Sequence, residues 1–210
     1  MVMSLSLWLA FFIAAWAISF SPGPGAIAVM SASLNHGFAR GCFATFGLIL
    51  GFWTQLVVVA VGLGAVIATS AFAFTVVKWL GVAYLVYLGI RQWRAPPLVL
   101  PIGNLSAPPI RRRRIVVEAW LLNAVNPKGT VFMLAVVPQF LVPSEPLVPQ
   151  YLAIGATLAF TDLVVNTGYA ALASRLLGLL RSPNRLRAVQ RVFGSLFIAL
   201  GALLATFKRV

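Results

Sequence analysis

Two charged side chains lie inside long apolar stretches of this sequence, Lys128 and Asp162. A charge near the centre of a membrane-spanning helix costs roughly 2.5–3.5 kcal/mol on insertion scales, so such residues generally mark a ligand or ion pathway. Asp162 and Asn166 are four residues apart and would share one face of a helix. The two charges could serve a polar ligand, or they could merely neutralise each other inside a helical bundle. Neighbouring side chains that could complete hydrogen bonds are Asn123, Asn126, Thr161 and Asn166.

The helices that must position these side chains are interrupted at two places. Residues 21–25 read Ser-Pro-Gly-Pro-Gly within an apolar run from about 5 to 34, and residues 126–129 read Asn-Pro-Lys-Gly within a second run. Proline lacks an N–H and glycine adds backbone freedom, so neither stretch can continue a regular helix. In lipid, the freed backbone groups need partners inside the protein or in a water-filled cavity. Paired interruptions in two halves of a chain indicate a transporter's binding site, which adds Pro22, Gly23, Pro24 and Pro127 to the candidate residues.

The composition is that of an integral membrane protein. The 210 residues are 61% hydrophobic and 9% charged, whereas soluble domains carry about 25% charged residues. The bases that give the net charge of +13 gather between apolar runs, as in cytoplasmic loops. We therefore expect a lipid bilayer, and no nucleic acid, as partner. One His, one Cys and three acids form no metal cluster or evident nucleophile–base pair, so we expect no enzyme, metal or cofactor.

About 20 apolar residues are needed to cross a bilayer as a helix. By this measure the sequence predicts an all-α integral membrane protein with a single transmembrane domain, residues 1–210. Residues 93–114 form a linker in which the density of prolines argues against a helix. The six predicted transmembrane helices cover roughly residues 5–33, 41–66, 70–92, 115–140, 147–174 and 188–208.

Arginine and lysine are divided unequally between the two sides of the predicted membrane. Twelve lie in the segments after the first, third and fifth spans, whereas Lys78, Lys208 and Arg209 lie on the other side. The positive-inside rule places the richer side in the cytoplasm. With six spans, both termini would then be periplasmic. The arginine run at 111–114 would anchor the chain beside anionic headgroups.

The two halves share a spacing that indicates an internal repeat. Pro24 and Met30 are six residues apart, as are Pro127 and Met133, at an offset of 103 residues. Together with the breaks, this predicts two repeats of three helices, residues 5–92 and 115–208, each with a proline-broken first helix. Because three is odd, the second repeat would be inverted relative to the first. Inverted repeats support alternating access around a site at the membrane midplane.

Two Gly-x-x-x-Gly pairs mark the start of the second predicted span, Gly37 with Gly41 and Gly47 with Gly51. Small residues at this spacing share a helix face and let helices approach closely. We expect a structural role for this face. It could pack within the bundle or between protomers, which leaves a homo-oligomer open.

Over nearly its whole length, the sequence resembles the LysE superfamily of amino-acid exporters, most closely the branch that exports threonine, homoserine and leucine. The resemblance implies an exporter of small amino acids in the bacterial inner membrane, driven by the proton motive force. The linker departs from the family in being unusually rich in proline and arginine. The matching features are Pro-Gly-Pro at 22–24, the four glycines above, Lys78, Gly81, Tyr84, Leu85, Tyr87, Leu88, Gly89, Asn123, Asn126-Pro127-Lys128, Pro138-Gln139-Phe140, Gly194 and Gly201.

An amino-acid substrate would be a zwitterion, which assigns a role to each charge. Helix N-termini at the breaks, together with Lys128, would bind its carboxylate. Asp162 would receive the ammonium group or a proton in exchange, because burial favours the neutral acid whereas a nearby cation favours the carboxylate. Asn123, Asn126 and Asn166 would complete the substrate site. A passive channel and a membrane protein for assembly or lipid handling are the alternatives.

Overall fold

The computed structural model describes residues 3–69, 71–94, 110–180 and 183–206, and every regular element in them is helical. The predicted all-α class is therefore confirmed for this part of the chain. The helices are α1 Leu5–Phe20, α2 Pro24–His36, α3 Phe38–Thr69, α4 Ala71–Arg94, α5 Arg112–Ala124, α6 Pro127–Val136, the 3-10 helix η1 Val137–Phe140, α7 Leu147–Leu180 and α8 Pro183–Thr206.

Both predicted breaks are present, and they have the same local structure. Helices α1 and α2 meet at an angle of 55°, and α5 meets the α6–η1 segment at 51°. Pro24 and Pro127 each occupy the first position of the second helix of the pair, where a missing N–H costs nothing because it would have no helical partner. The methionines that follow them, Met30 and Met133, are both buried.

The described residues contain two helices that are individually long and apolar enough to cross a membrane, Phe38–Gly62 of α3 and Leu147–Ala173 of α7. Each bent pair also passes this test as one unit, which raises the number to four. The predicted count of six spans stays a prediction, because α4 and α8 do not meet the criterion in the part that is described.

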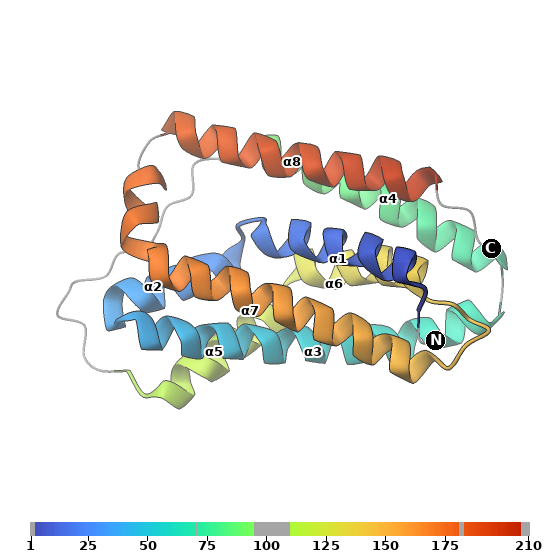
Figure 1. The fold of residues 1–210 in the computed structure, drawn as a ribbon, viewed down its shortest axis with the longest axis horizontal. Helices are drawn as coiled ribbons and strands as arrows, with labels where there is room; N and C mark the ends of the chain where they lie inside the picture. Colours follow the sequence, from blue (N-terminus) through green and yellow to red (C-terminus); the bar gives the residue numbers. More distant parts are fainter. Residues whose placement is uncertain (1–2, 70, 95–109, 181–182, 207–210) are drawn as a thin grey trace.

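The second half of the chain runs opposite to the first (Figure 1). Helices α1 and α2 run one way along the molecule, and α5 and α6 run the other way. The same holds for α3 against α7 and for α4 against α8. Helices α4 and α8 pack together along one side of the molecule, at the top of Figure 1. Helices α3 and α7 lie on the opposite side, and α1 and α6 lie between the two pairs.

Arginines gather at one end of the described structure. Helix α2 ends there, α5 and α8 begin there, and α4 ends toward it (left in Figure 1). Helix α4 carries Arg91 and Arg94 in its last turn, and α5 starts with three arginines. The arginines that are concentrated in certain segments of the sequence are thus also concentrated at one end of the folded molecule.

Helix α5 begins at Arg112, inside the segment predicted as a helix-free linker. Arginine is a good helix former, and the last proline of the segment, Pro109, comes before it, so nothing prevents the helix from starting early. The Arg114 Nε donates to the Glu118 Oε1 at 2.7 Å in an exposed ion pair one turn long. The rest of the predicted linker, up to residue 109, lies mainly outside the described residues.

Helix α3 packs closely against α5 through two glycines. A Cβ added at Gly47 would lie 2.8 Å from the Ala119 Cβ, and one at Gly51 would lie 2.6 Å from the Trp120 carbonyl oxygen. The predicted packing role is confirmed for both, and the contact lies within the bundle. For Gly37 it is wrong, because a Cβ there would meet nothing within 4 Å. Gly37 instead ends α2 with a φ of 88°, a conformation that glycine adopts without strain.

We expect Gly47→Leu to reduce the yield of folded protein strongly and to leave substrate preference unchanged in whatever folds. The added side chain would have to separate α3 from α5. Fluorescence-detected size-exclusion chromatography of solubilised membranes measures the folded fraction. Gly62→Leu is the matched control, since it lies on the same helix and a Cβ there meets nothing within 4 Å. A well-folded Gly47→Leu protein with altered substrate preference would contradict this prediction.

Candidate functional site

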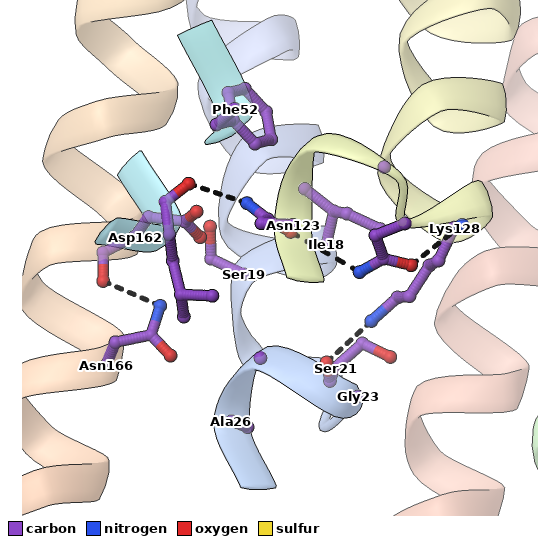
Figure 2. A pocket seen from close by; sticks show the side chains of 14 residues that line it. Ile18, Ser19, Ser21, Gly23, Ala26, Phe52, Asn123, Lys128, Asp162 and Asn166 are labelled. Atoms are coloured by element: carbon purple, nitrogen blue, oxygen red, sulfur yellow. Dashed lines mark hydrogen bonds between the residues drawn. The ribbon is translucent and has the colours of Figure 1, made fainter. Parts of the chain in front are cut away.

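The two helix breaks meet at a cavity of about 60 Å³ (Figure 2). Its wall is built by the α1–α2 break, the α5–α6 break, and one side each of α3 and α7. A buried water molecule needs roughly 10–15 Å³ on this scale, so the cavity has room for a few waters. The predicted site residues in its wall are Gly23, Asn123, Asn126, Lys128, Asp162 and Asn166.

The three predicted prolines do not line this cavity. Pro24 and Pro127 begin α2 and α6, and Pro22 lies in the bend between α1 and α2. Their structural effect is to end one helix and start the next, which leaves backbone groups and short side chains facing the cavity.

Lys128 connects the two breaks. It lies in the first turn of α6, and its Nζ donates to the Ser21 carbonyl oxygen at 2.6 Å, at the end of α1. The same Nζ lies 5.8 Å from the centre of the Phe197 ring on α8. Its backbone N–H donates to the Asn126 Oδ1 at 3.1 Å, which caps α6. The ammonium group therefore has one close acceptor and an aromatic face.

Asp162 and Asn166 lie one turn apart on α7, and both face the cavity, as the spacing predicted. The Asn166 Nδ2 donates to the Asp162 backbone carbonyl at 3.0 Å. The Ser19 hydroxyl lies beside the Asp162 carboxylate (Figure 2) and is 3.0 Å from the Thr161 hydroxyl. The Ser19 hydroxyl of α1 thus links the acid to the Thr161 hydroxyl of α7.

Lys128 and Asp162 do not touch. The only ion pair among the described residues joins Arg114 and Glu118. Figure 2 shows Asp162 on the α7 side of the cavity and Lys128 on the opposite side. A direct ion pair, the alternative raised by the sequence, is absent from this structure, and the two charges interact only across the cavity.

The N-terminus of α2 lies at the same cavity. No side chain caps this helix, and the first-turn N–H groups of a helix have no partner within it. Gly25 and Ala26, which supply these groups, line the cavity. A Cβ added at Gly23 would lie 3.6 Å from the Lys128 Nζ, so the ammonium group and the helix N-terminus are neighbours. Together they form a positive wall that suits an anion.

The carbonyl groups freed by the breaks are bonded inside the protein, as expected for backbone at membrane depth. At the first break, the Tyr169 hydroxyl donates to the Phe20 carbonyl at 2.7 Å, and Lys128 bonds that of Ser21. At the second break, the Asn123 carbonyl at the end of α5 accepts a hydrogen bond from the Gln55 Nε2. The Tyr84 hydroxyl donates at 3.4 Å to the Pro127 carbonyl, in the first turn of α6.

Gln55 on α3 is the residue that the sequence reasoning missed. Its Nε2 donates to the carbonyls of Asn123 and Asn126, at 2.6 and 2.9 Å, and so holds the second break. A Cβ on Gly129 would lie 2.5 Å from the Gln55 Oε1, so a side chain at position 129 would displace the Gln55 amide from its place at the break. The available signal was a single glutamine within an otherwise apolar predicted span.

The three asparagines of the site differ in the hydrogen bonds that their side chains make within the protein. The Asn123 Nδ2 donates to the Leu48 carbonyl at 2.7 Å, and the Asn126 Nδ2 donates to the Asn123 Oδ1 at 3.4 Å. These two side chains hold α3, α5 and α6 together, whereas Asn166 bonds only its own helix in this part of the structure. Asn166 is the asparagine best able to change partners when a ligand enters.

Comparison with known proteins gives a consistent family match. The LysE type translocator family matches residues 16–207. The chain is 41% identical over 206 residues to the homoserine/homoserine lactone efflux protein of Salmonella typhi, covering 98% of this chain and 99% of that one. It is 39% identical to an uncharacterized membrane protein of Vibrio cholerae, covering 98% and 100%, and 24% identical to the leucine efflux protein of an Enterobacter species, covering 96% of each. No solved structure matches this chain.

Proposed function

The chain belongs to the LysE type translocator family, a family of multi-pass membrane proteins, and from this premise we propose that it exports small amino acids or their derivatives across the bacterial inner membrane. The observation that carries the proposal is the cavity between the two helix breaks, with a cationic wall at Lys128 and an acid at Asp162 on the other side. The names of two relatives, which export homoserine, homoserine lactone or leucine, support the same class of substrate.

The placement of the two charges on opposite sides of one cavity suits a zwitterion. The substrate carboxylate accepts hydrogen bonds from Lys128 and from the N–H groups of Gly25 and Ala26, and its ammonium group binds Asp162. To bind in this way, the carboxylate takes the place of the Ser21 carbonyl as partner of the Lys128 Nζ. Substrate binding therefore releases a contact between the first and the second half of the chain, and this contact is where a change of conformation can begin.

Inverted repeats and alternating access are the finer part of the proposal. The antiparallel course of the corresponding helices supports them. So does the packing, since α3 contacts α5 and α6 of the other half, and α7 contacts α1 and α2 in the equivalent way. The halves differ elsewhere: α4 packs on α6, whereas among the described residues no extensive contact joins α8 to α2. A carrier caught on one side of its cycle has this kind of asymmetry.

Asp162 couples transport to protons in this mechanism. Facing the cytoplasm, the carboxylate loses its proton and binds the ammonium group of the substrate. Facing the periplasm, a proton takes the place of the ammonium group, and the neutral acid lets the empty carrier return. One substrate leaves for each proton that enters, and the membrane core never holds an uncompensated carboxylate, which would be costly there.

The arginine-rich end of the molecule is assigned to the cytoplasm by the positive-inside rule, which puts both termini in the periplasm. In a protein whose native Cys42 is replaced by alanine, we expect a cysteine at position 113 to be protected from an impermeant maleimide in intact cells. A cysteine at position 145, in the loop at the opposite end, is expected to react. Arg113 and Glu145 are both exposed, so burial does not explain the difference. Reaction at 113 in intact cells would reverse the orientation.

Flux through proteoliposomes tests the function itself. Vesicles containing the protein are loaded with radiolabelled L-homoserine, and its movement is followed with a pH gradient imposed. Uphill movement that stops when an uncoupler is added supports coupled export. Downhill flux that ignores the uncoupler identifies a channel. Absence of flux for homoserine, leucine and threonine alike would favour a role in assembly or lipid handling.

A further inference from the structure

A second and larger cavity, of about 320 Å³, lies between α2, α3 and α5. None of its lining residues belongs to the first cavity. Its wall includes Ser31, Asn35 and His36 of α2, Ala44 of α3, and Glu118 and Ala119 of α5. We call the space bounded by these six residues the vestibule.

The vestibule lies next to the central cavity along α3 and α5. On α3, Leu48 lines the central cavity and Ala44 lines the vestibule. On α5, the corresponding residues are Asn123 and Ala119. Four residues of helix span about 6 Å, so the two cavities follow each other within about one helical turn. The vestibule lies on the side toward the arginine-rich end, where α2 ends and α5 begins.

Two polar atoms in the vestibule wall lack a partner. The Ser31 Oγ and the Asn35 Oδ1 are both buried, and neither has a hydrogen-bond partner in the structure. Buried polar groups in folded proteins nearly always have one, so a molecule that binds here is expected to supply it. An amide oxygen only accepts hydrogen bonds, which means that the ligand must donate.

The charge of the vestibule selects the kind of donor. Glu118, the acid in its wall, lies at the surface and is held by Arg114. The described wall contains no lysine or arginine, and its other titratable residue is His36. Oxygen acceptors in a wall that contributes an acid but no lysine or arginine suit a primary ammonium group. The arginines around the opening, such as Arg40, whose Nη1 donates to the carbonyl of Ile110 in the wall, give the opening a positive field that attracts carboxylates.

We propose that the vestibule is a cytoplasmic binding site through which the substrate passes before the central cavity, and that Asn35 and Ser31 accept its ammonium group there. The inference rests on the proposed export function and orientation. It divides the path of a zwitterion into two steps. The ammonium group enters first and is held by Asn35. It then moves toward Asp162 on α7, past the nine residues, or about 13.5 Å of helix, that separate Asn35 from Ala26 in the wall of the central cavity. The carboxylate meanwhile reaches Lys128 and the start of α2.

The test measures the apparent KM for L-homoserine separately from the two faces of the membrane. We expect Asn35→Leu to raise KM from the cytoplasmic face about fivefold or more, the loss expected for a missing hydrogen bond. From the periplasmic face, KM should stay close to that of the parent. Asn35→Asp, which keeps an acceptor and adds a negative charge, should retain or lower the cytoplasmic KM. Ser31→Ala should have a smaller effect in the same direction as Asn35→Leu.

Ser33→Ala is the matched control. It makes the same change on the same helix, but the Ser33 Oγ donates to the Ala170 carbonyl on α7 at 2.6 Å and lies outside both cavities. If Ser33→Ala raises the cytoplasmic KM as much as Ser31→Ala does, the effect comes from the packing of α2 and the proposal is overturned. An unchanged cytoplasmic KM in Asn35→Leu, or an equal rise from both faces, also overturns it. If the parent itself moves no substrate, the proposed function has failed, which is a distinguishable result.

Discussion

Replacing Asp162 by asparagine is expected to abolish proton-driven accumulation of substrate while leaving insertion and folding intact. Asparagine has a similar volume and can keep the hydrogen bond with Ser19, but it cannot exchange a proton for an ammonium group. A gradient of one pH unit supports about tenfold accumulation when one proton is exchanged for one substrate. We expect the parent to approach this ratio in inverted membrane vesicles and Asp162→Asn to reach only equal concentrations on both sides.

The measurement is pH-gradient-driven uptake of labelled L-homoserine, combined with exchange of labelled for unlabelled substrate without a gradient. Retained exchange in Asp162→Asn would separate a loss of coupling from a loss of binding. Glu145→Gln is the control, because it removes an exposed acid in the loop before α7 that lies in neither cavity. If Asp162→Asn accumulates substrate as well as the parent, then Asp162 does not couple transport to protons, and its role is to balance the charge of Lys128.

The features that could be read from the sequence are those with a local cause. Pro24 and Pro127 end one helix and start another through their own covalent structure, so both breaks were predictable to within a few residues. Lys128 and Asp162 were conspicuous because charge is costly in an apolar stretch. The separation of Asp162 and Asn166 by four residues fixes that they share a face of α7. None of these inferences needed a neighbouring helix.

The features that could not be predicted depend on which helices meet. Nothing in the spacing indicates that Gln55 of α3 bonds the carbonyls at the break before α6. Nor does it show that the Lys128 Nζ contacts the Ser21 carbonyl instead of Asp162. Gly37 is a case in which the pattern predicted a contact that is not formed. Its spacing from Gly41 fits a packing motif, but Gly37 ends α2 with a positive φ. A pattern in sequence cannot distinguish a close approach of two helices from a turn in one.

Removal of the charge of Lys128 is expected to weaken substrate binding strongly, even in exchange without a gradient. In Lys128→Met, the substrate carboxylate keeps the N–H groups at the start of α2 but loses the ammonium partner. Hydrogen bonds to charged groups contribute about 1.5–3 kcal/mol, so we expect a roughly 10- to 150-fold loss of affinity. Methionine has a similar length and is apolar, which preserves packing against Phe197. Arg113→Ala is the control, since it removes an exposed cation from the neighbouring α5.

The same variant tests whether the two charges form one functional unit. If substrate bridges Lys128 and Asp162, each single change already breaks the bridge, and the double variant Lys128→Met/Asp162→Asn should lose less than the sum of the single losses in free energy. The cycle is measured by exchange of L-homoserine, for which each variant retains a detectable rate if the start of α2 still binds the carboxylate. Strict additivity would mean that the two side chains act on different ligands or steps. A Lys128→Met protein with the affinity of the parent would leave the N-terminus of α2 as the carboxylate site and reduce Lys128 to a structural bond between the two breaks.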